Sequence, residues 1–326
     1  MLREGTDAGA LQDAAGSIAA GELVAFPTET VYGLGARADD DAAVAKIFAA
    51  KGRPADHPLI VHVAQPAEAE AFARTVSPLA RRLMAAFWPG PLTLILPRAD
   101  GIAQAAAGGQ DSIGLRCPSL PVARALLAAT HRLGVPGVAA PSANRFGRVS
   151  PTQAAHVVEE FGDALSVLDG GRCELGIESS IVDCSREHPV LLRPGVLTRA
   201  RIEAAAGEPL RAPDAQAPRA PGTLAAHYAP RATLRLMSST MLSSALQLLG
   251  NPPLRLAVYS RGVAPPATPG VRHRRMPALP AQVAHELFAV LRELDAEGVQ
   301  LIWVEEPPAA PEWDGVRDRL RRAAAS

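Results

Sequence analysis

The chain has 326 residues, of which 48% are hydrophobic, and its formal net charge at pH 7 is zero. This length allows a sizeable core and favours two domains over one, and the balanced charge gives no support to nucleic-acid binding through bulk electrostatics. The three cysteines, Cys117, Cys173 and Cys184, lack the spacing of a disulfide framework or a zinc site, which indicates a reducing cytosol. We expect no membrane span, since no apolar run reaches roughly 18 residues, and no signal peptide.

The first 206 residues alternate short apolar runs with helical patterns. The runs predicted as strands are 23–26, 59–63, 92–96, 113–116, 137–140, 180–182 and 190–193. The predicted helices are 39–50, capped by an aspartate of 39–41, and 66–74, 77–87, 120–133, 151–161 and 198–206. Because several strands follow one another without a helix between them, we expect a twisted mixed α/β sheet flanked by helices.

The composition changes at residues 207–222, GEPLRAPDAQAPRAPG, which read as an extended Pro-rich linker. We therefore expect a first domain of 1–206, a linker of 207–230 and a second domain of 231–326. The second domain has a β-α-β-α-β-α pattern, in which the apolar runs 254–259 and 299–304 predict buried parallel strands and 282–294 a helix. This pattern is typical of a small Rossmann-like three-layer α/β domain, although no GxGxxG follows a strand to indicate a dinucleotide site.

Polar residues gather where the predicted strands of the first domain end. They lie in PTETVYGLG from Pro27, SIGLR from Ser112, PSAN from Pro141, SPT from Ser150, ESS from Glu178 and RPG from Arg193. Open α/β sheets bind ligands at strand ends, so these clusters predict one shared crevice. Its cations suit an anionic ligand that carries a phosphate and a carboxylate. The chain has no Walker A loop, no convincing Ser-His-Asp order and no metal cage.

Two residues near these clusters, Lys51 and His62, each allow a second interpretation. The only two lysines among 33 basic residues are Lys46 and Lys51. Lys51 and Arg53 can form an anion clamp around Gly52, or Lys51 can complement the dipole of a helix that Gly52 stops. His62 can bind a ligand or be a satisfied structural group. Ser150-Pro151-Thr152 is expected to open a helix whose amides can receive an anion.

The order of seven motifs resembles that of the YrdC-like threonylcarbamoyl-AMP synthases. The motifs are PTETVYGLG, KGRP followed by HPLIVH, SIGLRCP, APSAN, SPT, ESSIVD and LLRPG, and they lie within residues 15–205. The segments 220–222, 227–230, 291–295 and 313–320 resemble the linker and the C-terminal domain of the long, two-domain form of this family. The resemblance implies a YrdC-like catalytic domain followed by a smaller domain.

The resemblance also implies an activity. L-threonine, bicarbonate or CO2, and ATP would give L-threonylcarbamoyl-AMP and pyrophosphate, and a separate complex would transfer the threonylcarbamoyl group to the adenosine next to the tRNA anticodon. The implied L-threonine site consists of Thr30, His62, Arg116 and Ser179. The implied ATP site consists of Lys51, Arg53, His57, Ser112, Ala140, Ser142, Asn144, Ser150, Arg193 and Tyr228. Lys51 and Arg53 would lie nearest the reacting groups, and Mg2+ would be held mainly by the ATP phosphates.

Two residues depart from the family pattern. His57 stands where the family usually has Asn, so activity is expected to depend on pH near the ordinary imidazole pKa of roughly 6.5. Ser180 in ESSIVD replaces a threonine and keeps the hydroxyl. The resemblance places Tyr228 over ATP, which predicts that residues 207–230 fold back as a lid and exclude water. A plain tether would equally explain the Pro-rich composition.

Two other functions compete with the synthase. The first is a module that binds double-stranded RNA or tRNA without turnover. The 31 arginines permit a basic patch for it, but 33 acidic residues offset them overall. The second is a related carbamoyl-transfer enzyme of hydrogenase maturation, which also carries acylphosphatase-like and zinc-finger segments. The cysteines of this chain cannot supply such zinc sites.

Overall fold

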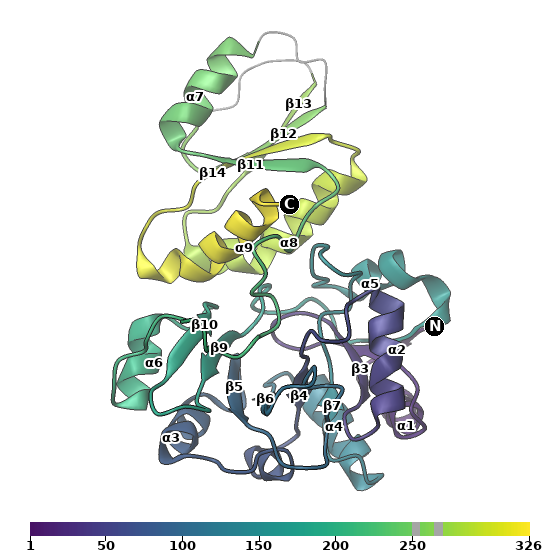
Figure 1. Cartoon of the computed structure of the whole chain (residues 1–326). Coiled ribbons are helices and arrows are strands. Elements are labelled where there is room, and N and C mark those ends of the chain that lie inside the picture. Colours follow the sequence, from purple (N-terminus) through teal and green to yellow (C-terminus); the bar gives the residue numbers. More distant parts are fainter. Residues whose placement is uncertain (250–254, 264–269) are drawn as a thin grey trace.

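The computed structural model describes residues 1–249, 255–263 and 270–326, and its strands form two separate sheets (Figure 1). The strands of the first sheet lie within residues 2–193 and those of the second within 233–305. We call the elements β1 to α6 the larger unit, the segment 207–232 the linker, and the elements β11 to α9 the C-terminal unit. The domain limits expected above, 1–206, 207–230 and 231–326, stay a prediction.

The larger unit is built on a ten-stranded mixed sheet of order β1-β8-β2-β3-β7-β4-β6-β5-β9-β10. Its strands are β1 (Leu2–Glu4), β2 (Val24–Phe26), β3 (Gly33–Arg37), β4 (Ile60–His62), β5 (Leu92–Pro97), β6 (Ser112–Arg116), β7 (Val138–Ala139), β8 (Ser166–Asp169), β9 (Ser180–Asp183) and β10 (Val190–Arg193). Its helices are α1 (Ala8–Ala19), α2 (Asp41–Lys51), α3 (Pro78–Phe87), α4 (Pro121–Arg132), α5 (Ala154–Phe161) and α6 (Arg199–Ala206), with the 3-10 helices η1 (Pro66–Ala71) and η2 (Gly162–Ala164). The predicted mixed sheet flanked by helices is therefore confirmed.

Two predictions for the larger unit are wrong. The segment 66–74 is a 3-10 helix over Pro66–Ala71, and the helix expected over 151–161 begins at Ala154. Residues 150–152 precede that helix, and the Thr152 amide donates to Nδ1 of His156 rather than facing an anion (3.2 Å). Helix α1 and strands β1, β3 and β8 have no counterpart among the predicted elements, and the turn expected over residues 27–35 overlaps the start of β3. Gly35 is required there by close packing, since a Cβ would lie 2.8 Å from the Phe26 ring.

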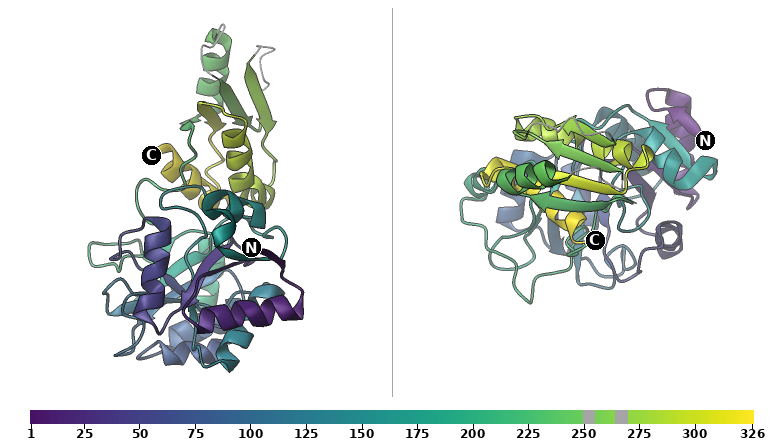
Figure 2. Two further views of the ribbon diagram at one scale, coloured as in Figure 1. Left: turned by 90° about the vertical axis from the view of Figure 1, so that its right-hand side faces the viewer. Right: turned by 90° about the horizontal axis from the view of Figure 1, so that it is seen from above.

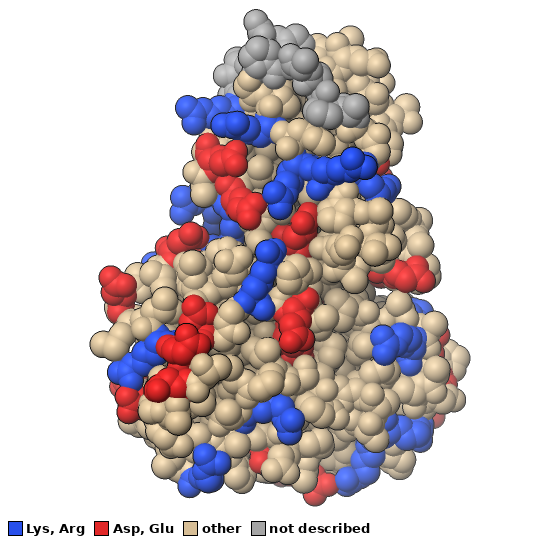
Figure 3. All heavy atoms as spheres, turned by 180° about the vertical axis from the view of Figure 1, so that it is seen from behind, with Lys and Arg blue, Asp and Glu red and all other residues tan. Residues whose placement is uncertain are grey.

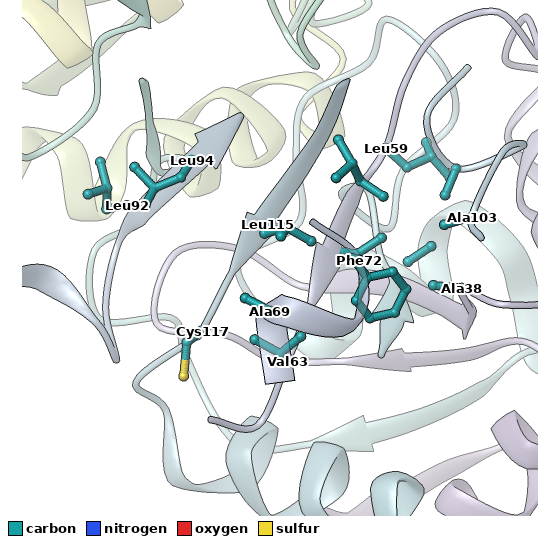
Figure 4. Packing of buried hydrophobic residues seen from close by; sticks show 14 of the residues in the cluster. Ala38, Leu59, Val63, Ala69, Phe72, Leu92, Leu94, Ala103, Leu115 and Cys117 are labelled. Atoms are coloured by element: carbon teal, nitrogen blue, oxygen red, sulfur yellow. The ribbon is translucent and has the colours of Figure 1, made fainter. Parts of the chain in front are cut away.

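The core of the larger unit lies against the middle of its sheet. Leu92 and Leu94 of β5 and Leu115 of β6 belong to one buried cluster with Phe72, which follows η1 (Figure 4). Neighbouring side chains of the same strands, such as Ile95, belong to a second cluster on β9 and β10 that includes Ala220 of the linker. The linker therefore packs on the sheet.

The C-terminal unit has a four-stranded sheet of order β11-β14-β12-β13, and all its strand pairs are parallel. Its strands are β11 (Thr233–Met237), β12 (Leu256–Ser260), β13 (Val271–Arg275) and β14 (Leu301–Glu305). Its helices are α7 (Ser239–Leu248), α8 (Pro280–Ala296) and α9 (Asp314–Ala324), with the 3-10 helix η3 (Pro311–Trp313). Alternate residues of β12 pack on α7 and on the α8–α9 side, which gives the three predicted layers.

One strand of the C-terminal unit was not predicted. Strand β13 has the sequence VRHRR and is exposed beyond its first residue, so it lacks the apolar pattern of a buried strand. The order is therefore β-α-β-β-α-β-α instead of β-α-β-α-β-α. Leu254, the expected start of one strand, lies outside the described residues, and β12 begins at Leu256.

The two units are stacked, and helices α8 and α9 lie between the smaller sheet and the larger unit (Figures 1 and 2). Contacts across this junction include the stacked rings of Tyr228 and Phe288, whose centroids are 5.5 Å apart, and a hydrogen bond from Arg292 to the Val149 carbonyl. On the face seen in Figure 3, basic and acidic side chains lie interspersed. None of the helices in the described ranges has the length and apolar character that a membrane crossing needs.

Candidate active site

A cavity lies where several strands of the larger sheet end, and the linker covers it. His62 and Arg116 are the last residues of the paired parallel strands β4 and β6, so their side chains reach the same edge of the sheet. The residues that line it are Thr28, Val31, Gly33, Arg53, Ile60, His62, Arg116, Ala140, Pro141, Ser142, Glu178, Ser179, Arg193, Pro221, Gly222, His227 and Tyr228.

Arg116 is held rigidly at one end of the cavity. Its Nη2 donates to Oε1 of Glu29 (2.5 Å), its Nη1 to Oγ1 of Thr30 (2.8 Å) and its Nε to the Gly90 carbonyl (3.3 Å). Each Nη carries a second N–H, so a fixed pair of donors remains for a carboxylate. Burial and the neighbouring Arg116 lower the pKa of His62 to about 3, so this imidazole is neutral at physiological pH.

Arg193 joins the middle of the cavity to the linker. Its Nη2 donates to the carbonyl of Ser179 (2.9 Å) and to the hydroxyl of Ser179 (3.2 Å), and its Nη1 donates to the Pro221 carbonyl (2.9 Å). The Ser179 hydroxyl also shares a hydrogen bond with Thr93 (2.8 Å). Burial lowers the pKa of Arg193. This arginine therefore fixes a predicted threonine ligand and a linker residue at the same time.

Lys51 and Arg53 lie at the end of helix α2. Lys51 is the last helical residue and Gly52 is a left-handed C-cap, so the interpretation as a helix terminus is correct for the backbone. The Lys51 Nζ donates to the carbonyls of Ser142 (2.6 Å) and Asn144, which places it behind the cavity wall. Burial and then Arg53 lower the pKa of Lys51 well below its ordinary value. Arg53 lines the cavity, and burial lowers its pKa to about 10.

The linker closes the cavity with His227 and Tyr228, whose ring centroids lie 4.2 Å apart. Tyr228 has a positive φ of 62°, and its buried Oη has no hydrogen-bond partner within the described residues. Gly222 packs directly under that phenol, since a Cβ at Gly222 would overlap the Tyr228 Oη. Burial is the main cause that lowers the pKa of His227 to about 3. The predicted return of the linker over the crevice is thus present in the structure.

The other predicted residues lie at different depths. Thr30, Asn144 and Ser150 are buried directly behind the wall, and Ser150 donates to Oε1 of Glu178 (2.5 Å). His57 lies in an adjoining hollow that shares Arg53 and His227 with the cavity, and its ring centroid is 5.4 Å from that of Phe146. Ser112 is not brought to the cavity in the described part of the chain. It begins β6 while Arg116 ends it, which separates them by about 13 Å.

Buried polar atoms without a partner gather around this cavity. Within the described residues, Arg53 Nε, His62 Nδ1, His227 Nδ1 and Tyr228 Oη are buried and unpartnered, and all four residues line it. Native proteins leave few buried polar groups unsatisfied, and such groups call for an explanation by a ligand or water. The arrangement therefore suits a ligand that offers hydrogen-bond acceptors and negative charge.

Two family profiles together match almost the whole chain. The profile named Sua5/YciO/YrdC, described as "Telomere recombination", matches residues 17–195, and the profile described as "Threonylcarbamoyl-AMP synthase, C-terminal domain" matches residues 197–325. The chain belongs to the Sua5/YciO/YrdC family. It has the two-domain form of this family, as the motifs predicted.

Two relatives in this family match over more than nine-tenths of both chains. The threonylcarbamoyl-AMP synthase of Pyrococcus abyssi is 36% identical over 99% of this chain and 96% of its own length. The Bacillus subtilis enzyme of the same name is 37% identical over 96% of this chain and 92% of its own length. The crystal structure of P. abyssi Sua5 complexed with L-threonine matches with a TM-score of 0.86 at 37% identity, covering 96% of this chain and 94% of that chain.

Three charged residues of this family member were not among the predicted ligands. Glu29 and Glu178 stand inside the motifs PTETVYGLG and ESSIVD, so the signal was present although only their neighbours were assigned. Glu29 orients Arg116, and Glu178 accepts from Ser150. Arg319 reaches Glu178 from helix α9, and its Nε donates to Oε2 (2.8 Å). No local pattern separates this arginine from the others of α9, so sequence reasoning had no means of finding it.

Proposed function

We propose that the protein is an L-threonylcarbamoyl-AMP synthase, a nucleotidyltransferase that joins L-threonine, CO2 from bicarbonate and the AMP part of ATP. The observation that supports this most directly is the covered, cationic cavity with unpartnered polar atoms on Arg53, His62 and Tyr228. The full-length relatives that carry this name support it as well. The product would serve the modification of the adenosine next to the tRNA anticodon, through a separate transfer complex.

The reaction has two steps. The threonine amine attacks CO2, forms an N–C bond and loses a proton, which gives a carbamate. A carbamate oxygen then attacks the α-phosphorus of ATP in line, and the bond from that phosphorus to the bridging oxygen of pyrophosphate breaks. Such a transfer depends on positioning and charge neutralisation more than on a covalent nucleophile.

Threonine would bind at the Arg116 end of the cavity. The free N–H groups of Arg116 face the carboxylate, and Glu29 keeps the guanidinium in that orientation. His62 is neutral, so its unpartnered Nδ1 can accept a hydrogen bond from the amine or from the threonine hydroxyl without repelling the amine. Thr30 and Ser179 complete this end of the site.

ATP would bind along the opposite wall, between Arg53 and Arg193 and under the linker. Arg53 faces the cavity directly, while Lys51 acts through the carbonyls of Ser142 and Asn144 that it holds in place. Ala140, Ser150 and Tyr228 would surround the nucleotide, with His57 and Ser112 further out. The covering linker would exclude water and so protect the mixed anhydride product.

Mg2+ would enter with the ATP phosphates. No group of three or more His, Cys, Asp or Glu side chains suited to a metal ion occurs in the described ranges of the chain. The one carboxylate on the cavity wall, Glu178, is already engaged by Ser150 and Arg319. The free cysteines Cys117, Cys173 and Cys184 are all buried, which suits a reducing compartment such as the cytoplasm.

Pyrophosphate release tests this proposal. Purified protein is given Mg-ATP and bicarbonate with and without L-threonine, and we expect release only with threonine. Arg53→Ala should reduce kcat by about a hundredfold, as the loss of a transition-state donor does elsewhere. Release that is indifferent to threonine would indicate another acceptor. Binding of RNA without any release would favour the RNA-binding module.

A further inference from the structure

Arg319 of the C-terminal unit is fully buried (0% exposed) at the junction with the larger unit. Its Nε donates to Oε2 of Glu178 (2.8 Å) and its Nη2 to the Glu178 carbonyl (3.0 Å). Its Nη1 donates to the Pro194 carbonyl (2.8 Å) and to Asp318 (2.7 Å) on its own helix. One guanidinium therefore binds both the side chain and the backbone of a residue on the cavity wall.

Glu178 is the only acidic side chain among the described residues that line the cavity. Its second oxygen, Oε1, accepts the Ser150 hydroxyl, and Ser179 follows it directly in the chain. An unpaired carboxylate at this position would repel the phosphates of a bound nucleotide. Burial alone would raise the pKa of Glu178, but Arg319 and Arg193 outweigh burial and keep that pKa below its ordinary value.

The same guanidinium also contacts the linker. Its central carbon lies 5.3 Å from the centroid of the Tyr228 ring, within the range of a cation–π contact. Phe288 of α8 stacks against that ring as well. Arg319 thus touches a wall residue, Glu178, and a residue of the covering linker, although it belongs to neither segment.

We propose that Arg319 is a positioning residue of the active site, through which the C-terminal unit completes the nucleotide subsite. It neutralises Glu178, orients Ser150 through that carboxylate, and seats Tyr228 over the cavity. The proposal rests on the proposed function, because it assigns Arg319 a part in binding ATP. The C-terminal unit then serves as a component of the catalytic site rather than as an appended domain.

A purely structural clamp is the competing explanation, since breaking any buried ion pair destabilises a fold. The two explanations differ in what happens when the opposite charge is also removed. If the unpaired Glu178 carboxylate is what weakens ATP binding, then Glu178→Gln should restore binding to an Arg319→Gln protein. If Arg319 only stabilises the junction, the second substitution should bring no recovery.

The experiment compares full-length variants in pyrophosphate release and in calorimetric binding of Mg-ATP. Arg319→Gln should raise the KM for ATP by about thirtyfold or more, as loss of one partner of a buried pair does, with a smaller change in kcat. Arg319→Lys should recover part of the affinity, because it keeps the charge and loses the fork. Arg317→Gln is the matched control: it removes an arginine of the same helix that pairs with Asp314 (3.2 Å), away from the cavity.

A pH series adds a readout that a structural role would not change. In Arg319→Gln the Glu178 pKa should rise, so the ratio of variant to wild-type KM for ATP should shrink as the pH falls from 8 to 6. The imidazoles of His62 and His227 do not interfere, because their pKa values are about 3. His57, whose pKa is lowered, is present in both proteins, so its titration enters both KM values and cancels in their ratio. The groups that face Glu178 are Lys51, Ser150, Arg193, His227, Tyr228, Asp318 and Arg319.

The proposal holds if Glu178→Gln lowers the KM of the Arg319→Gln protein at least about fivefold, a coupling typical of interacting pairs. It is overturned if Arg319→Gln lowers only the melting temperature and leaves the KM at the Arg317→Gln value, or if the two substitutions act independently. If Arg319→Gln does not fold, the KM for ATP of Arg319→Lys is compared with that of the double variant instead. A wild type that binds Mg-ATP but releases no pyrophosphate would refute the proposed function, while the binding measurements would still decide the role of Arg319.

Discussion

The two sheets of this protein each end in a crevice where ligands of α/β proteins usually bind, yet the two crevices are built in opposite ways. In the larger unit, Arg53, His62 and Tyr228 line the covered cavity and carry buried polar atoms without a partner. In the C-terminal unit, the side chain of Glu305 occupies the corresponding position at the strand ends. Glu305 at the end of β14 accepts the amides of Arg261 (2.6 Å) and Gly262 (2.8 Å) and the hydroxyl of Ser239 (2.8 Å).

A position at the strand ends is therefore not sufficient to make a binding site. The amides that could hold an anion in the C-terminal unit are satisfied by Glu305, so that crevice contributes stability. In the larger unit, cations are buried at a cost in free energy and their polar atoms remain available. Within the described residues, four buried polar atoms without a partner belong to residues that line the cavity of the larger unit, whereas at Glu305 only Arg261 Nη1 lacks a partner. The number of unsatisfied polar groups, more than location, distinguishes the functional crevice from the structural one.

The largest expected effect comes from Lys51, the buried cation behind the functional crevice. Lys51→Ala leaves the carbonyls of Ser142 and Asn144 without their donor and releases that part of the cavity wall. We expect kcat/KM for threonine-dependent pyrophosphate release to fall by about a hundredfold. Lys46→Ala is the control on the same helix, because Lys46 is 45% exposed and pairs with Glu22 on the surface. Equal activity of the two variants would contradict a special role for Lys51.

The next effect tests whether the linker must close the functional crevice. Gly222 has a φ of 70°, and a Cβ at this position would overlap the Tyr228 Oη. Gly222→Ala should therefore displace Tyr228 and lower kcat/KM by about tenfold, with hydrolysis of the product in place of release. Gly207→Ala is the control, since Gly207 also has a positive φ but meets no neighbouring atom. Full activity of Gly222→Ala would favour a plain tether.

A substitution of Glu305 in the C-terminal unit should lower the stability of the fold and leave catalysis unchanged. The pKa of Glu305 is below its ordinary value. Burial alone would raise this pKa, but the hydrogen bonds from the Gly262 amide, the Ser239 hydroxyl and the Arg261 amide lower it by more. A carboxyl with a lowered pKa stabilises the fold above its unfolded pKa of about 4.3, and this contribution is lost as the pH falls through its folded pKa. Glu305→Gln should cost about 1–3 kcal/mol in urea unfolding at pH 7. The difference from wild type should shrink toward pH 4, and kcat should stay unchanged; a loss of kcat would refute the contrast.

The smallest effect is expected at His57, on the rim of the functional crevice. Burial and Arg53 lower its pKa below the ordinary 6.5, so the ring is neutral at pH 7 and above. His57→Asn, which restores the residue usual in the family, should change kcat/KM by less than about threefold at pH 7.5. Any gain in ATP affinity on protonation should appear only below pH 6.5. A pH dependence centred above 7 would contradict this reading.

Most of the fold could be predicted because it rests on local signals. Apolar runs located β4, β5, β6, β9 and β10 within a residue or two, and caps such as Asp40 and Gly52 located α2. Helix α1 and strands β1 and β8 were not predicted. Strands β3 and β13 were also missed, because β3 contains two glycines and β13 is mostly arginine. Their strand pairing is decided by packing and by neighbouring strands, which a single sequence does not contain.

The site could be predicted only as far as its motifs extend. Motif residues such as Arg116, Ser179 and Arg193 do meet in one cavity, together with Tyr228 from the linker. Ser112 does not, because it stands at the other end of the strand that carries Arg116. Arg319 lies 141 residues from its partner Glu178, and no pattern in the chain joins them. A pair of this kind can be identified only from a structure that contains both units.

The most direct test of the central claim, that the covered cavity joins threonine, CO2 and AMP, follows the carbon atom of bicarbonate. Wild-type protein is incubated with Mg-ATP, L-threonine and carbon-13-labelled bicarbonate, and the products are identified by mass spectrometry. The account predicts a threonylcarbamoyl-AMP that carries one labelled carbon and disappears when threonine is omitted or when Arg53 is replaced by alanine. Formation of AMP and pyrophosphate without any labelled adenylate would contradict it.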